Sequence, residues 1–93
     1  MSKKTSYFED VVAWHILVEH PVADEPSLEY SKSVNLGLKL VQEEYAELLS
    51  AYRKRNVEEF ADAVGDLIWV LCGFMARTGM NLDAVWAEIK KAN

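Results

Sequence analysis

Two clusters of acidic residues stand within apolar stretches of this 93-residue sequence. The first contains Glu43, Glu44 and Glu47, and the second extends from Glu58 to Asp66 and leads into an apolar segment. Carboxylates in an apolar helix cost free energy unless a cation meets them or a proton neutralises them. Because both clusters offer only carboxylate oxygens, the pattern favours a hard cation, magnesium or manganese, over zinc or copper.

The elements that must position these acids are helices. Apolar residues recur at helical spacing and predict four helices and no strands, an all-α four-helix bundle that is completed by oligomerisation. The helices are expected over about Ser6–Glu19, from between Ser27 and Ser33 to about Arg53, from about Val57 to about Arg77, and from Leu82 to about Lys91. Asn56 and Asn81 are the expected N-caps of the last two helices, and Gly79 is the expected stop of the third.

The short break near Arg53–Lys54 makes the second and third helices antiparallel neighbours. Counting outward from that break places Glu47 level with Phe60 and Glu44 level with Ala63. Residues three apart share one helix face, so four carboxylates are expected to meet across one groove: Glu44, Glu47, Glu59 and Asp62. Glu43 and Asp66 flank this set.

Acids at this spacing also occur in di-iron proteins and on solvated helix faces. A di-iron carboxylate bundle would need Glu-x-x-His on two helices, and neither acidic helix contains a histidine. A solvated acidic face, partly paired by Arg53–Arg55, is as compatible with the spacing as a metal site. The apolar neighbours, such as Val41 and Phe60, favour the metal site. Magnesium shares its coordination with substrate phosphates, so the implied chemistry is phosphoanhydride hydrolysis.

Composition narrows the range of partners. The formal net charge is −5, which speaks against a nucleic-acid backbone as partner. The longest apolar run, Leu67–Ala76, is about half of what a bilayer crossing needs, and no signal peptide is evident. We therefore expect one cytoplasmic domain over residues 1–93, without a membrane partner. The lone Cys72 is expected to be a core residue, and three Trp, three Phe and four Tyr in so short a chain suggest burial in an oligomer.

The motif Glu43-Glu44-x-x-Glu47, a spacer, then Glu59-x-x-Asp62 resembles the all-α nucleoside triphosphate pyrophosphohydrolases. This superfamily includes the MazG-like enzymes, the dimeric dUTPases and phosphoribosyl-ATP pyrophosphohydrolase. The resemblance covers nearly the whole chain and is strongest for short phage and bacterial members. The further segments that carry it are Trp14-His15, His20–Ala23, Pro26, Ala63–Val70, Gly79–Trp86 and Asn93.

The resemblance implies hydrolysis of a nucleoside triphosphate, often a deoxynucleotide, to the monophosphate and pyrophosphate. It implies magnesium, with manganese as a substitute, at Glu44, Glu47, Glu59 and Asp62, and Asp66 is able to join them. A metal-activated water would attack the α-phosphorus, with Glu43 or Glu47 orienting or deprotonating it. A homodimer or homotetramer is implied as well.

Residues outside the acids have two interpretations each. Trp14 and His15 would contact the base of the substrate or simply pack. Trp69 and Trp86 are expected in the core or at an interface. Short members of the family continue beyond the Asn with a Ser-Lys-containing tail, so Lys90, Lys91 or a basic residue of a partner subunit would replace its phosphate contact, or Lys90 and Lys91 would only end a helix. The resemblance alone suggests a substrate contact for Asn93, which would otherwise fray at the helix end. Two alternatives to the main prediction remain: phosphoribosyl-ATP hydrolysis, and a non-catalytic helical interaction module.

Overall fold

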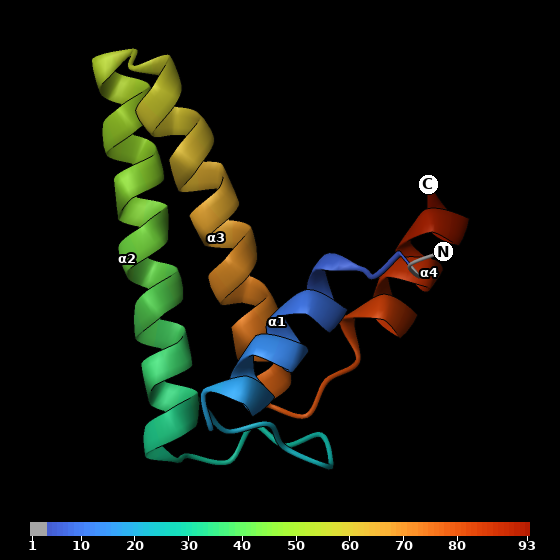
Figure 1. The fold of residues 1–93 in the computed structure, drawn as a ribbon. Coiled ribbons are helices and arrows are strands. Elements are labelled where there is room, and N and C mark those ends of the chain that lie inside the picture. The colour runs from blue at the N-terminus through green and yellow to red at the C-terminus, as the bar shows by residue number, and fades with distance from the viewer. Residues whose placement is uncertain (1–3) are drawn as a thin grey trace.

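The computed structural model describes residues 4–93, and over this range the chain forms four helices and no strand (Figure 1). The all-α prediction is therefore confirmed. The helices are α1 (Tyr7–Leu17), α2 (Lys32–Lys54), α3 (Val57–Arg77) and α4 (Leu82–Ala92). None of the helices in the described range combines the length and apolarity needed to cross a membrane.

Each helix begins at a side chain that accepts a hydrogen bond from the first turn. Ser6 and Glu9 form a reciprocal capping box at the start of α1, and Ser31 caps α2. Asn56 and Asn81 cap α3 and α4, as the sequence predicted. These caps satisfy backbone N–H groups that have no partner within the helix, and they fix where each helix starts.

Glycine is required at the stop that follows α3. Gly79 has a φ of 71°, and a Cβ placed there would collide with the Glu25 backbone oxygen. The residues after α3 therefore pass directly against the loop that precedes α2. Hydrogen bonds from the Ala23 and Ser27 N–H groups to the Ala76 and Thr78 oxygens hold this loop in place.

The long α2/α3 hairpin projects away from the rest of the molecule (Figure 1). The main helix contacts are α2 with α3 and α1 with α3. The start of α2 packs closely on the end of α3, because Gly37 is buried and its missing Cβ would lie 2.8 Å from Phe74 Cδ1. Helix α4 stands apart from α2, and Ser6 Oγ donates to Asp83 Oδ2 at 2.9 Å to tie it to the start of α1.

The core of the single chain is small and lies where α1 crosses α3. Val11 and Cys72 are its most buried large side chains, so the prediction for Cys72 is confirmed. Only one side of the apolar segment around Cys72 is covered, since Trp69 remains 41% exposed. Trp86 on α4 is 58% exposed. Completion of the bundle by a second chain stays a prediction.

Candidate functional site

A groove of about 290 Å³ runs between α2 and α3, and acidic side chains line it. Its floor is narrow because Ala51 and Ala63 are buried where the two helices meet. Small residues at this contact let the backbones approach, so longer side chains on either side face the groove. The lining is Glu47, Ser50, Ala51 and Lys54 from α2 with Glu59, Asp62, Ala63 and Asp66 from α3.

Three carboxylates come close enough to share one cation. Glu44, Glu47 and Asp66 each offer an oxygen, and these oxygens lie within 4.8 Å of one another. Glu44 is half-buried, whereas Glu47 and Asp66 are exposed. We call these three residues the acidic triad. An all-oxygen donor set of this kind suits a hard divalent cation.

Glu44 is the residue of the triad that most needs a partner. Its Oε2 atom is buried and meets no hydrogen-bond donor among the described residues. Burial, then the neighbouring Glu47, and then the charges of Asp66 and Glu43 raise the pKa of Glu44. Two ionised carboxylates cannot donate to each other, so Glu44 and Glu47 need either a shared proton or a cation. The triad therefore fits a divalent metal ion.

The predicted partner of Glu47 across the hairpin was wrong. The sequence placed Phe60 beside Glu47, whereas Asp66, almost two helical turns further along α3, lies there. The ring of Tyr52 packs beside Phe60 at 6.5 Å between centroids, and Glu47 meets Asp66, not Phe60. The reason is that α2 continues through Lys54 and the chain reverses at Arg55, which has a left-handed φ of 57°. Counting from this later reversal brings Ala63, eight residues beyond Arg55, level with Glu47, eight residues before it. Helical side chains lean toward the N-terminus of their helix, so Glu47 and Asp66, which lies three residues beyond Ala63, lean toward each other and meet between these levels.

This shift separates the predicted metal ligands into two parts. Glu44 and Glu47 meet in the triad together with Asp66, the residue expected only to flank the set. Asp62 and Glu59 line the same groove closer to the chain reversal. Ligand roles for all five acids remain predictions. Glu43 is exposed and does not line the groove, although its charge acts on Glu44.

The sequence allowed Arg53–Arg55 to pair partly with the acids, but it did not single out Lys54 as the base that lines the groove. Lys54 lines it, and Lys54 Nζ lies 3.8 Å from Glu59 Oε2. The run Arg53-Lys54-Arg55 indicates favourable charge at a helix end and partial pairing of the acids, without showing which of the three bases enters the groove. Lys54 lies one residue before Arg55 and Glu59 four residues after it, and the long Lys54 side chain spans this difference because it leans toward the N-terminus of α2. The direction of this side chain was the missing signal.

The aromatic-histidine pair of α1 belongs to the crossing of α1 and α3. His15 is 3% exposed, its Nδ1 lies 3.1 Å from the Pro21 oxygen, and Gly73 leaves room for its ring. Burial, which outweighs the opposing contact with Pro21, lowers the pKa of His15. Trp14 is partly exposed and meets Trp69 edge-on at 5.5 Å. These contacts are those of packing residues, and substrate contacts by Trp14 and His15 stay predictions.

The residues predicted at the C-terminal end make contacts within α4. Lys91 Nζ lies 3.3 Å from a Glu88 carboxylate oxygen, and the Asn93 side chain donates to the Ile89 oxygen at 2.9 Å. Both contacts are typical of a helix C-terminus. Phosphate contacts by Lys91 and Asn93 stay predictions.

Comparison with known proteins identifies the family. The family model described as phosphoribosyl-ATP pyrophosphohydrolase matches residues 11–93. The chain is also similar to an uncharacterized protein of Acanthamoeba polyphaga mimivirus, with 37% identity over 65 residues. That match covers 70% of this chain but 24% of the viral protein, so the chain spans about a quarter of that relative's length. The family match and the all-helical fold confirm the resemblance that the acidic motifs carried. The chain belongs to the phosphoribosyl-ATP pyrophosphohydrolase family, and the general activity of its family is pyrophosphohydrolysis.

Proposed function

We propose that the protein hydrolyses a nucleoside triphosphate, preferably a deoxynucleotide, to the monophosphate and pyrophosphate with magnesium as cofactor. Manganese is the expected substitute. One observation carries this proposal: three carboxylates from facing helices converge within 4.8 Å, and a buried oxygen of Glu44 lacks a donor among the described residues. The family match supports cleavage of a pyrophosphate bond in general.

The acidic triad, Glu44, Glu47 and Asp66, would hold the ion, and Glu59 and Asp62 extend the donor set along the groove. Bound magnesium supplies charge stabilisation for the phosphoryl oxygens and a water nucleophile at neutral pH. The chain's own task is to hold the phosphates along the groove and to accept a proton from the attacking water. Of the two carboxylates expected to accept it, Glu47 lines the groove and Glu43 does not. This difference favours Glu47.

The test is a panel of dNTPs and NTPs assayed by chromatography for monophosphate and by a coupled assay for pyrophosphate. Each reaction is run with magnesium, with manganese and with EDTA. We expect pyrophosphate release from at least one nucleotide that stops in EDTA. Absence of release from every nucleotide, together with a melting temperature that does not respond to magnesium, would refute the proposal and favour a non-catalytic helical module.

Phosphoribosyl-ATP is the second candidate substrate, because the matching family model carries that description. It contains the same α–β phosphoanhydride, so the acidic groove would act on it in the same way. Including phosphoribosyl-ATP in the panel separates the two candidates by the ratio of kcat/KM values. A kcat/KM for phosphoribosyl-ATP well above that for any simple nucleotide would assign the protein to this substrate.

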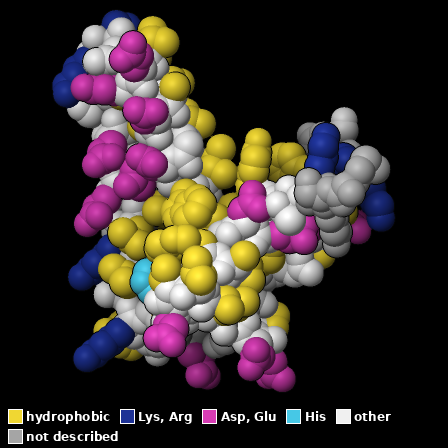
Figure 2. Space-filling view, in the orientation of Figure 1, with side chains coloured by type: hydrophobic (Ala, Val, Ile, Leu, Met, Phe, Trp, Pro, Cys, Tyr) yellow, Lys and Arg dark blue, Asp and Glu magenta, His cyan; other side chains and the backbone are white. Residues whose placement is uncertain are grey.

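We also propose that the protein acts as a homodimer or homotetramer. Its accessible surface is 7257 Å², whereas a compact monomer of 10.6 kDa is expected to expose about 5,500 Å². The excess is larger than the roughly 800 Å² that each partner buries in a standard interface. Apolar side chains gather between the hairpin and α4 (Figure 2). Exposed members on these helices are Ile68, Trp69, Leu71, Val85, Trp86 and Ile89.

A further inference from the structure

Lys54 is the cation that lines the acidic groove within the described part of the chain. Three bases stand together at the end of α2, but they differ in what they contact. The Arg55 guanidinium donates to the Tyr52 oxygen at 2.8 Å and lies 4.3 Å above the Tyr52 ring. Arg53 is not among the residues that line the groove. Lys54 alone of the three presents its charge there.

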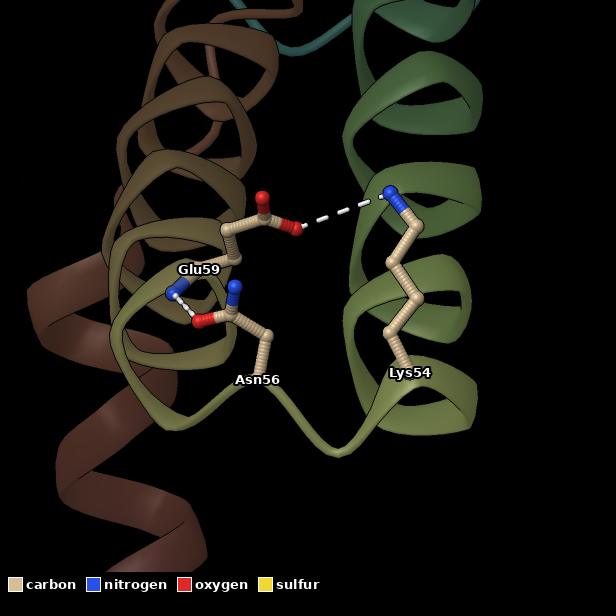
Figure 3. Close-up of polar contacts among 3 residues, drawn as sticks. All are labelled: Lys54, Asn56 and Glu59. Atoms are coloured by element: carbon tan, nitrogen blue, oxygen red, sulfur yellow. Dashed lines mark hydrogen bonds and ion pairs between the residues drawn. The ribbon is translucent and has the colours of Figure 1, made fainter.

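The local structure aims Lys54 along the groove. Side chains of a helix tilt toward its N-terminus, and in Figure 3 the Lys54 stem runs from the chain reversal back along α2. Its Nζ reaches toward Glu59 across the groove at 3.8 Å. Asn56 Oδ1 accepts from the Glu59 N–H at 3.0 Å, which fixes the first turn of α3 and the place of Glu59 opposite Lys54.

The charges in the groove show why a polyphosphate needs this lysine. Glu44, Glu47, Glu59, Asp62 and Asp66 carry five negative charges when ionised. Two divalent cations would leave one of these charges uncompensated, and Lys54 brings the balance to zero. Without Lys54 the incoming phosphates, which are themselves highly charged, would meet a net negative groove.

The contact between Lys54 and Glu59 is easily exchanged. Both side chains are more than half exposed, and an exposed pair at this distance contributes little to stability. Glu59 is also a predicted metal ligand, so a cation that binds Glu59 would release Lys54. The released ammonium would remain in the groove, on the side of the triad toward the chain reversal.

We propose that Lys54 binds the β- and γ-phosphates of the substrate, the part that leaves as pyrophosphate, and that it exchanges Glu59 for these phosphates. Lys54 is then a substrate-binding residue that makes the groove prefer a triphosphate over a monophosphate. In this arrangement the α-phosphate would lie nearer the acidic triad. This inference rests on the proposed function and names the residue that selects the length of the phosphate chain.

The experiment measures binding by calorimetry with magnesium present, using Lys54→Gln and the matched control Arg53→Gln. Arg53→Gln removes the same charge one residue away on the same helical turn. Three probes are used: a nucleotide with a non-hydrolysable imido bridge between the α- and β-phosphates, inorganic pyrophosphate, and the nucleoside monophosphate. Because a charge-assisted hydrogen bond is lost, Lys54→Gln is expected to weaken the affinity for the imido nucleotide and for pyrophosphate by about tenfold or more. The monophosphate should be unaffected, and Arg53→Gln should change none of the three.

Lys54→Arg tests the chemistry of the contact, because it retains the charge and should recover most of the affinity for the triphosphate analogue. If Lys54→Gln weakens the binding of all three probes equally, the inference is overturned, since Lys54 would then act on the α-phosphate or on the fold. Unchanged binding of the triphosphate analogue and pyrophosphate would overturn it as well. Failure of the wild type to bind any probe would refute both the inference and the proposed function. Normal turnover by the wild type, together with unchanged binding of the triphosphate analogue by Lys54→Gln, would refute only the inference.

Discussion

Replacement of Glu44 by glutamine should stabilise the metal-free protein and abolish its stabilisation by magnesium. The buried Oε2 of Glu44 lacks a donor among the described residues, and the pKa of Glu44 is raised mainly by burial and then by Glu47. A glutamine has nearly the same shape and carries no charge. Its amide can donate to Glu47, which an ionised Glu44 cannot do.

The magnitude follows from the distances within the triad. An oxygen of Glu44 lies within 4.8 Å of an oxygen of Glu47 and of Asp66. Two unit charges at this separation repel by about 1 kcal/mol in the dielectric of water and by about 3.5 kcal/mol at an effective dielectric of about 20. Glu47 and Asp66 are exposed, so the lower value applies to each pair. The two pairs together give about 2 kcal/mol, or a rise in melting temperature of about 8–16 °C for a domain of this size.

The assay is thermal unfolding of wild type and Glu44→Gln in EDTA and in magnesium. It is run near pH 8 and again near pH 5. A carboxyl with a raised pKa in the folded state holds its proton more tightly there than in the unfolded chain. Stability is therefore lost as the pH rises above the ordinary value of 4.5 and through the folded pKa. The wild type should show this loss in EDTA, and Glu44→Gln should lack it.

Glu43→Gln is the matched control, because it removes the same charge at an exposed position next to Glu44. It should change the free energy of unfolding by less than about 0.5 kcal/mol. A lower melting temperature for Glu44→Gln than for wild type in EDTA would refute the electrostatic reasoning. Equal stabilisation of both proteins by magnesium would show that the ion binds elsewhere.

Five further outcomes test the site, the fold and the assembly. Glu47→Gln and Asp62→Asn should each reduce pyrophosphate release by at least about 10²-fold while circular dichroism stays that of the wild type; activity retained in both would show that the site is misplaced. Gly37→Ala should lower stability by about 1–2 kcal/mol, since its Cβ meets Phe74 at 2.8 Å and overpacking exceeds the gain in helix propensity. Gly65→Ala, where a Cβ meets nothing within 4 Å, should instead raise stability by up to about 1 kcal/mol. The pKa of His15 is lowered by burial, so urea denaturation should show stability falling as the pH drops below 6.5, and an NMR titration of its ring should show a midpoint under that value. Light scattering should give a mass of two or more chains, and a monomeric mass at micromolar concentration would contradict the proposed oligomer.

Helix positions followed from the sequence because local signals agreed. Asn56 caps α3 and Gly79 adopts a positive φ after it, as their residue types predicted. The role of Gly37 could not be predicted, because a glycine within a helix signals only a local cost until the residue packed against it is known. The opposing contact, Phe74, lies 37 positions further along the chain.

The acidic cluster was predicted as a cluster, but its internal arrangement was not. The apolar neighbours of the acids on α2 and α3 favoured carboxylates that face one another, whereas which carboxylates meet depends on where the chain reverses and on how the side chains lean. The continuation of α2 through Lys54 and the left-handed Arg55 moved the residue level with Glu47 from Phe60 to Ala63. An error in the position of a turn is doubled in an antiparallel pair, because it counts on both helices. The lean of side chains toward the N-terminus of each helix accounts for the remaining distance to Asp66.

The separation of the acidic triad from the hydrophobic core explains how the fold tolerates its charge. The groove lies in the projecting part of the hairpin, where Ala51 and Ala63 alone are buried between the helices. The core lies at the other end of α3, around Val11 and Cys72. Repulsion among the acids would therefore act on the contact between α2 and α3 near the groove and not on this core. A cation bound to both helices would close this contact directly, so the proposed metal binding would stiffen the hairpin and leave the α1/α3 crossing unaffected.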